Sequence, residues 1–496
     1  MGNIAIVDGT RITESSLETL PHGGNCLDRV LAFARALPDV TATVLLSSGT
    51  PTDVAGCRVE RKDTWNVRDL LEAIRRHGNG MEDVFYFHAD CPLLDAGLAS
   101  RMHGNHRKYF ADYTYADGYP YGLAPQILAV RSLGPLLSLV RDGDGVPDRD
   151  ALFTVLKRDI NAFDIETEIA PEDQRLLRAS LTTDTRRNRM LVSRLMERGG
   201  RDAATVCSLL HETPGILRTL PAYVCLQVVD GCPQECAYCP FPVSRPGVLS
   251  RRGFLDPSLF RRAVAAVSDF CGDATVGISL WGEPSLHPDI GMLIRSVLET
   301  PGLDLLVETC GIGWDEELLR RMRGECARSP TWIVSLDAQS AQLYGRLRGA
   351  GYPEAVRTAE LLQSLWPETA YVQAVRMKEN EEDCEAFYKA WKARSERLII
   401  QKYDGFCGLL ADRSVADLSP VERFPCWHLR RDVSVLMDGT VPLCREDLQG
   451  TRRMGNLFED GLPAVWQAME EPYREHLECR YGPLCAQCDE YYTYNF

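Results

Sequence analysis

Three cysteines lie close together in this chain, in the order Cys232-Pro-Gln-Glu-Cys236-Ala-Tyr-Cys239. They follow an apolar segment, 223–229, whose residues are typical of a buried strand. Thiolates at this CX3CX2C spacing can ligate three irons of a cubane iron–sulfur cluster and leave the fourth iron without a protein ligand. The alternative is zinc, but structural zinc needs four closed ligands and this loop supplies three. The spacing therefore favours an open, reactive iron–sulfur cluster.

A second group of cysteines lies near the C-terminus, where we expect a small domain that is held together by metal. Residues 433–443 alternate in polarity and turn at Asp438-Gly439, a pattern that predicts a β-hairpin. The four expected thiolate ligands are Cys426, Cys444, Cys485 and Cys488. A site with four protein ligands is closed, which suits structure or electron transfer rather than substrate activation, and a zinc ribbon with the same thiolates is the alternative.

We expect a soluble, cytoplasmic protein. The N-terminal sequence has no cationic start followed by an apolar run, and no uncharged apolar segment reaches the roughly 20 residues that span a bilayer. Structural disulfides are rare in a reducing compartment, so clustered cysteines there more often hold metal or do redox chemistry. The net charge of −15 argues against binding to nucleic acids or to anionic membranes, since both depend on a positive field.

Hydrophobic periodicity divides the 496 residues into three regions of an α/β protein. Residues 1–195 alternate short apolar strands with amphipathic helices, which predicts a Rossmann-like α/β domain, and residues 196–221 form a charged helical linker that ends in Pro and Gly. Six strand–helix units within 222–405 predict a partial (β/α)6 TIM barrel with a parallel sheet. Residues 406–496 are the small cysteine-rich domain.

The first cysteine loop resembles the signature of the radical S-adenosylmethionine (SAM) enzymes, and later motifs match that family in order. Residues 278–284, ISLWGEP, resemble its GGEP motif, and residues 334–337, VSLD, resemble its SLD strand end. Residues 375–380, VRMKEN, resemble a later strand end that carries an arginine. One motif departs from the family, because Cys310 stands where the usual third-strand motif has an asparagine.

This resemblance implies a role for each matching position. Cys232, Cys236 and Cys239 would ligate a [4Fe-4S] cluster whose open iron binds SAM, and reductive cleavage of SAM would give a 5′-deoxyadenosyl radical that abstracts hydrogen from a substrate. The residues that the resemblance assigns to SAM binding are Tyr238, Gly282, Glu283, Ser335 and Arg376. Singly, such residues are more often surface charges or helix caps, but their common position at consecutive strand ends favours a site.

The C-terminal cysteines resemble the SPASM/twitch domain of radical enzymes, whose pattern is C-X9–15-G-X4-C followed by further cysteines. That resemblance implies auxiliary [4Fe-4S] clusters, and the full set of two needs about seven cysteines. This chain has five from Cys426 onward, with Cys407 just upstream. We therefore expect one auxiliary cluster, with two as the alternative. Cys407 is expected to be buried without ligating, and Cys479 to be either a substitute ligand or spare.

The N-terminal region resembles, more loosely, the nucleotidyltransferases that activate sugars. Residues 85–94, FYFHADCPLL, resemble a strand-end motif in which an aspartate, here Asp90, holds a metal beside the nucleotide phosphates. The Gly-rich turn with Arg and Lys that would cradle a triphosphate is missing, because the first lysine of the chain is Lys62. We therefore predict a nucleotidyltransferase-type fold that binds or supports rather than catalyses, and a helix cap is the alternative role of Asp90.

Taken together, the motifs resemble the spiro-SPASM family of radical enzymes along the whole chain. The implied function is a radical SAM enzyme of the oxidoreductase or peptide-modifying class, acting on a peptide or protein side chain or, second, on a sugar-derived molecule. The implied partners are that substrate and a reductant such as flavodoxin or ferredoxin. Two other classes stay open: a sugar-activating nucleotidyltransferase with a metal-binding regulatory C-terminal half, and a non-catalytic zinc scaffold.

Overall fold

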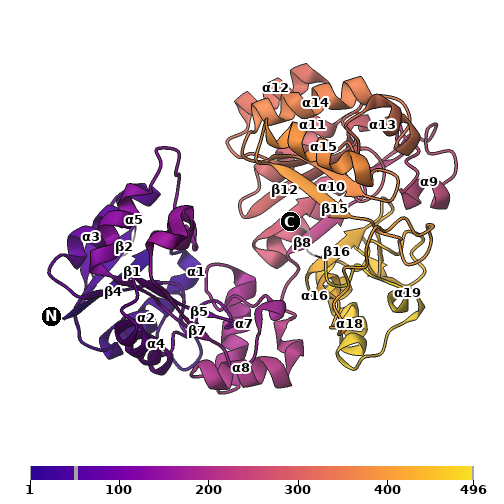
Figure 1. The fold of residues 1–496 in the computed structure, drawn as a ribbon. Helices are drawn as coiled ribbons and strands as arrows, with labels where there is room; N and C mark the ends of the chain where they lie inside the picture. Colours follow the sequence, from indigo (N-terminus) through magenta and orange to yellow (C-terminus); the bar gives the residue numbers. More distant parts are fainter. Residues whose placement is uncertain (1, 50–53, 494–496) are drawn as a thin grey trace. The chain divides into compact units, whose positions relative to one another are not determined.

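The computed structural model describes residues 2–49 and 54–493, and its contacts divide the chain into two compact units, Met1–Thr219 and Leu220–Phe496 (Figure 1). Each unit is built on its own seven-stranded sheet. The cysteine-rich segment lies in the second unit together with the barrel strands. The boundaries expected at residues 195, 221 and 405 stay predictions, and each unit is described separately below.

The sheet of the first unit has the strand order β3-β2-β1-β4-β6-β5-β7. Its strands are β1 (Asn3–Gly9), β2 (Val40–Ser47), β3 (Arg58–Arg61), β4 (Asp83–His88), β5 (Tyr113–Asp117), β6 (Gln126–Ala129) and β7 (Ile165–Ile169). Strands β3, β2, β1 and β4 are parallel neighbours, and β6 runs antiparallel to both β4 and β5. Along β1, Ala5 and Val7 pack into one hydrophobic cluster and Ile4 and Ile6 into another, so both faces of the sheet are covered.

Helices pack against this sheet on both faces. They are α1 (Glu14–Leu17), α2 (Cys26–Ala36), α3 (Val67–Gly78), α4 (Ala96–Lys108), α5 (Leu133–Ser138), α6 (Ala151–Leu156), α7 (Arg186–Glu197) and α8 (Ala203–Glu212). Asn25 and Asn66 begin α2 and α3 with capping boxes, as their positions before amphipathic runs require. The segment 196–221 is helical, but Val206 and Leu210 of α8 are buried in the core of the first unit, so it is a packed part of this unit. The likeness of the unit to nucleotidyltransferases stays a prediction.

The sheet of the second unit has the order β15-β14-β13-β12-β11-β8-β16, and every neighbouring pair is parallel. Its strands are β8 (Tyr223–Leu226), β11 (Ala274–Gly277), β12 (Leu303–Thr309), β13 (Thr331–Ser335), β14 (Ala370–Arg376), β15 (Leu398–Lys402) and β16 (Asp432–Val435). The first six of these are the six predicted barrel strands. The expected parallel α/β arrangement of this region is therefore confirmed.

Strand β16 reaches this sheet from the cysteine-rich segment. Its Val433 is in parallel register with Val224 of β8. The chain turns at Gly439, where φ is +86°, but the next strand, β17 (Thr440–Pro442), pairs with β18 (Arg453–Asn456). The expected turn at Asp438-Gly439 is therefore present, closed by a hydrogen bond from the Leu436 N–H to the Thr440 carbonyl oxygen at 2.8 Å, but β16 and β17 do not pair as a two-stranded ladder. Val433 and Val435 lie instead on β16, which pairs with β8 at the edge of the barrel sheet.

Helices alternate with the barrel strands and cover the outer face of the sheet. The helices of this unit are α9 (Pro240–Ser244), α10 (Pro257–Cys271), α11 (Ile290–Leu298), α12 (Glu316–Glu325), α13 (Ala341–Leu347), α14 (Tyr352–Leu365), α15 (Glu381–Lys392), α16 (Trp427–Arg431), α17 (Leu462–Ala468), α18 (Glu470–Leu477) and α19 (Pro483–Ala486). Phe260 and Val264 of α10 share a core with Val276 of β11. Because parallel strands end at one edge, the loops that follow them meet there. Among the helices of residues 2–49 and 54–493, none has the length and apolar character to cross a bilayer.

Candidate active site

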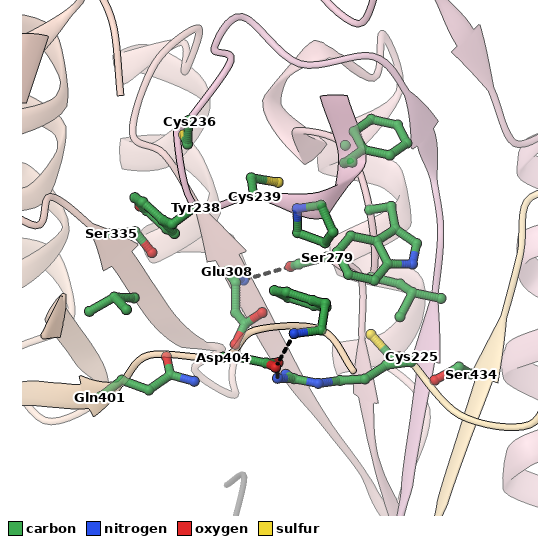
Figure 2. Close-up of a pocket in the computed structure, with 18 of the residues that line it drawn as sticks. Cys225, Cys236, Tyr238, Cys239, Ser279, Glu308, Ser335, Gln401, Asp404 and Ser434 are labelled. Atoms are coloured by element: carbon green, nitrogen blue, oxygen red, sulfur yellow. Dashed lines mark hydrogen bonds and ion pairs between the residues drawn. The ribbon is translucent and has the colours of Figure 1, made fainter. Parts of the chain in front are cut away.

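The three cysteines of the first loop line one cavity of about 250 Å³ (Figure 2). The cavity reaches the end of the barrel at which the strands have their carboxyl ends. Polar residues on or just after six of the strands are among those that line it: Ser279, Glu308, Ser335, Gln373, Gln401 and Ser434. Gly231 precedes the loop and has no space for a side chain, since a Cβ there would lie 2.2 Å from the carbonyl oxygen of Arg251. Tight backbone packing thus fixes where the cysteine loop begins.

The thiols of this loop fit an open iron–sulfur site. Cys232, Cys236 and Cys239 provide three sulfur donors beside a cavity that has space for a further ligand. Burial raises the pKa of Cys236 to about 11, so a bound metal charge has to drive its ionisation. A hydrogen bond with the thiol of Cys310 holds the pKa of Cys232 below its ordinary value. Cys310 thus lies against the cysteine loop, where the family motif has an amide.

Gly282 and Glu283 connect the end of β11 to the cysteine loop and to β12. Gly282 has φ +90°, and a Cβ there would lie 2.3 Å from the carbonyl oxygen of Val229, so glycine is required. The carboxylate of Glu283 is buried and accepts hydrogen bonds from Thr309 Oγ1 at 2.6 Å and from the Cys310 N–H at 2.8 Å. Gly282 lines the cavity, whereas Glu283 is held behind it. In this structure Glu283 braces neighbouring strand ends, and a contact with SAM stays a prediction.

Tyr238 and Ser335 both line the cavity, as expected from the motifs. The Tyr238 hydroxyl donates to Asp337, and Arg348 donates to both of these oxygens. Arg348 also donates from Nε to Gln234 Oε1 at 3.1 Å, and its side chain is only 5% exposed. Burial raises the pKa of Tyr238 well above its ordinary value, so its hydroxyl stays protonated and can donate. This buried network ties the cysteine loop to β13 and α13.

The network includes residues that the sequence did not single out. Asp337 ends the VSLD motif and Arg348 follows α13, but neither was expected at the site. Asp337 has φ +63°, a left-handed conformation that is uncommon for aspartate, and its carboxylate accepts from the Val375 N–H at 2.7 Å. A sequence signal existed, because both are charged residues that directly follow buried apolar segments.

The structure does not bring Arg376 into the cavity. Its side chain is exposed and forms an ion pair with Glu381, with 2.6 Å between Nε and Oε2. Arg376 is the last residue of β14, and its side chain is not among those that line the cavity in the described part of the chain. The role expected for Arg376 in binding a carboxylate therefore has no support in its position.

The four cysteines expected to form the second site lie around one smaller cavity. Cys426, Cys444, Cys485 and Cys488 all line it. The expectation that Cys407 is buried is wrong, because it is only half-buried: it lines the same cavity, and its thiol is hydrogen-bonded to that of Cys488. Four sulfur donors from separate loops fit a closed iron–sulfur cluster or zinc.

The remaining cysteine of this segment points elsewhere. Cys479 is exposed and is not among the residues that line the smaller cavity. Of the two roles expected for Cys479, a substitute ligand or a spare cysteine, this placement favours the second. Cys444 lines both cavities, so the two cysteine sites are adjacent within the second unit.

In the first unit, Asp90 is held by an arginine. Arg149 donates to both carboxylate oxygens of Asp90, with 3.1 Å between Nη1 and Oδ1, and to Asp184 at 2.8 Å. Asp90 is buried. The guanidinium thus neutralises the carboxylate that would have to ligate a metal. This geometry supports the expectation that catalysis of nucleotidyl transfer is absent from this unit, which itself stays a prediction.

The cysteine sites and the parallel barrel agree with comparisons to known proteins. Residues 226–390 match the model of the radical SAM superfamily, and residues 426–489 match the SPASM iron–sulfur cluster-binding domain. An uncharacterized protein from Treponema pallidum is 37% identical over 359 residues, which cover 70% of this chain and 98% of that protein.

More distant similarities cover parts of the chain. A GTP 3′,8-cyclase from Vibrio cholerae is 34% identical over 151 residues, 29% of this chain and 42% of the cyclase, so the match spans less than half of that enzyme. The crystal structure of Streptococcus suis SuiB bound to S-adenosylmethionine has a TM-score of 0.43 and 14% identity, covering 54% of this chain and 70% of SuiB.

The fold and its paired cysteine sites define an iron–sulfur protein built on a radical SAM barrel. The chain belongs to the radical SAM superfamily and carries a C-terminal SPASM domain. The resemblance to the radical SAM enzymes and the resemblance to the SPASM domain are therefore confirmed. The number of auxiliary clusters, the substrate and the role of the first unit are not fixed by membership of the superfamily.

Proposed function

We propose that this protein is a radical SAM enzyme that cleaves SAM reductively and abstracts hydrogen from a side chain of a peptide or protein. The observation that carries the proposal is the position of Cys232, Cys236 and Cys239 on one loop beside the cavity at the barrel strand ends. When a [4Fe-4S] cluster and SAM are bound there, they supply the reductive chemistry and the hydrogen-abstracting radical.

The residues of the chain provide binding, orientation and exclusion of water. The network of Gln234, Tyr238, Asp337 and Arg348 holds the cysteine loop against β13. Gly282 allows the loop after β11 to approach the carbonyl of Val229 closely. The apolar rings of Phe241 and Trp281 are stacked 6.4 Å apart and line the cavity, which limits the access of water.

The preference for a peptide or protein substrate rests on the SPASM resemblance, and a sugar-derived molecule is the second choice. In this proposal the electron for SAM cleavage comes from an external one-electron donor. Flavodoxin or ferredoxin would serve as this donor. The auxiliary cluster, held by Cys426, Cys444, Cys485 and Cys488, would provide a closed site for electron transfer beside the cavity.

The test is the formation of 5′-deoxyadenosine. Protein that has been reconstituted anaerobically with iron and sulfide is incubated with dithionite and SAM, and the product is measured by mass spectrometry. We expect product with the wild type and with Cys326→Ala, whose cysteine lies at the end of α12 and lines neither cavity. We expect none above background with Cys232→Ala. Equal product from Cys232→Ala, or none from the wild type, would overturn the proposal.

A further inference from the structure

The side of the cavity opposite the cysteine loop is lined by charged residues (Figure 2). We call this surface the charged floor and define it as Glu308, Lys402, Asp404, Asp432 and Arg445, all of which line the cavity. Figure 2 shows the carboxylate of Glu308 pointing away from Cys236 and Tyr238 and toward Asp404. The charged floor therefore faces the space into which a substrate would extend from the cysteine loop.

Both cations of the charged floor already have carboxylate partners. Lys402 Nζ lies 3.0 Å from Asp489 Oδ2 and also pairs with Glu490. Arg445 donates from Nε to Glu446 at 2.8 Å and from Nη2 to Asp404 at 3.3 Å. These pairs neutralise the two positive charges, so the charged floor offers little to a substrate anion.

Asp432 and Asp404 are engaged as well. Asp432 Oδ2 lies 2.6 Å from His428 Nδ1. Asp404 accepts from the Phe406 N–H at 2.8 Å in addition to the Arg445 contact. Each of these two acids therefore has at least one protein partner that holds its carboxylate in place.

Glu308 differs from the other acids of the charged floor. It lies on β12 two residues after Leu306, whose side chain packs inside the barrel with Tyr223 and Cys225, so Glu308 faces the same interior. Its backbone N–H donates to Ser279 Oγ at 2.6 Å. Over residues 2–49 and 54–493, no protein donor forms a hydrogen bond or ion pair with its carboxylate. Burial raises the pKa of Glu308 and the charge of the nearby Arg445 lowers it, with burial the larger effect, so Arg445 only partly offsets the cost of charging this carboxylate.

We infer that the substrate carries a protonated amine that binds the carboxylate of Glu308 in the cavity. This inference rests on the proposed function and specifies the chemistry of its substrate. A cation beside Glu308 repays the desolvation of the carboxylate and gives it charge-assisted hydrogen bonds. The uncharged side chains of Ser279, Gln373 and Gln401 also line the cavity and offer hydrogen bonds to neutral polar groups near that amine.

The same geometry disfavours a phosphorylated or carboxylated substrate. Such an anion would meet Glu308 and Asp404, and the nearby guanidinium of Arg445 is already bound by Asp404 and Glu446. Like charges in a partly buried site raise the free energy of binding. A nucleoside triphosphate, the substrate class named for the distant GTP 3′,8-cyclase relatives, is therefore a poor match to this charged floor.

The amine could belong to a lysine side chain of a peptide or to a small amino sugar, and matched probes distinguish these sources. One pair is acetyl-Gly-Lys-Gly-amide and acetyl-Gly-norleucine-Gly-amide, and the other is glucosamine and glucose. Binding is measured by isothermal titration calorimetry on the anaerobically reconstituted protein with SAM present. We expect the amine of at least one pair to bind about tenfold or more tightly than its neutral partner.

Variants assign that preference to Glu308. Glu308→Gln should abolish the preference, Glu308→Asp should retain most of it, and Asp304→Asn, which changes an exposed carboxylate on the same strand, should leave it unchanged. Melting temperature and visible iron–sulfur absorbance check that each variant is folded. The inference is overturned if neither amine is preferred by the wild type, or if folded Glu308→Gln keeps the preference. If Glu308→Gln does not fold, loss of the preference in Asp304→Asn overturns it, and retention of the preference in Glu308→Asp supports it.

This experiment also separates the inference from the proposed function. Binding is measured without SAM cleavage, so the preference for amines can hold even if no 5′-deoxyadenosine forms. Conversely, SAM cleavage without any preference for an amine would contradict only the inference. The lysine arm indicates a peptide or protein substrate, and the glucosamine arm indicates a small molecule.

Discussion

Arg348 donates from Nε to Gln234 Oε1 at 3.1 Å across 114 residues of sequence. This bond ties the turn after α13 to the loop that carries the first three cysteines. Arg348 is also paired with Asp337, and neither side chain is more than 5% exposed. The cysteine loop is thus positioned by a buried charge network of the barrel, as well as by its own sequence.

Replacement of Arg348 by methionine should destabilise the second unit. The change leaves the Asp337 carboxylate buried without its cation, and breaking such a pair costs about 3–5 kcal/mol. Chemical denaturation should show this loss, and the iron bound by the reconstituted protein should fall. Arg346→Met, which changes an exposed arginine two residues earlier at the end of α13, is the matched control and should change neither value. Equal stability of the two variants would contradict the assigned role of the network.

Replacement of Gly282 by alanine should displace the cysteine loop. The new Cβ would lie 2.3 Å from the Val229 carbonyl oxygen at a φ of +90°, so the cost should exceed about 1 kcal/mol. Iron content and visible absorbance should fall after reconstitution. Gly345→Ala is the control, since nothing lies within 4 Å of a Cβ there. A Gly282→Ala protein with full iron content would show that the close approach is not required.

The C-terminal cysteines should differ in their effect on iron content. Cys444→Ser should lose about four iron atoms per chain, because it removes one ligand of the auxiliary [4Fe-4S] cluster. Cys479→Ser should lose none, because this side chain is exposed and lies outside the smaller cavity. Cys407→Ser should also keep its iron, since four other thiols complete the closed site. Loss of iron from Cys407→Ser would instead identify a further ligand.

The stability of the first unit should fall in acid because of Asp83. Burial raises the pKa of Asp83, but a hydrogen bond with His103 and the nearby ring of His106, whose Nε2 lies 3.4 Å from Asp83 Oδ1, lower it more, so the net pKa lies well below the ordinary value of 3.8. A carboxyl whose pKa is lower in the folded state contributes stability above its unfolded pKa, and this contribution is lost as the pH falls below about 4. Thermal unfolding at pH 3 to 7 should show the loss, and Asp83→Asn should flatten it. An equally steep acid limb in the variant would assign the loss to other groups.

Much of the second unit could be predicted from the sequence. The six strand–helix units predicted within 222–405 correspond to β8 and β11 to β15, because buried parallel strands leave continuous apolar runs between helical patterns. The two cysteine sites were also predicted, since ligand spacing in CX3CX2C and CX2C turns is a local property. The candidates Tyr238, Gly282 and Ser335 line the cavity as expected.

Other parts depended on contacts between distant segments. The partner of β16 could not be predicted, because the alternation of 433–435 satisfies a hairpin and a barrel edge equally well. Arg376 ends strand β14 and Arg348 follows helix α13, yet only Arg348 is buried at the site. Glu308 is one of the two charged residues in the otherwise largely apolar strand β12, and the direction of its side chain follows from the register of β12 with its neighbours.

The sequence by itself determined the class of chemistry and the secondary structure, because both depend on the spacing of residues a few positions apart. Only the tertiary structure decided which charges are paired and which are left facing the cavity. Arg149 is bound to Asp90 over 59 residues, and Arg445 to Asp404 over 41 residues, whereas the Glu308 carboxylate has no such partner within the described ranges. Pairing of this kind is set by long-range packing, and it decides the charge that a substrate meets.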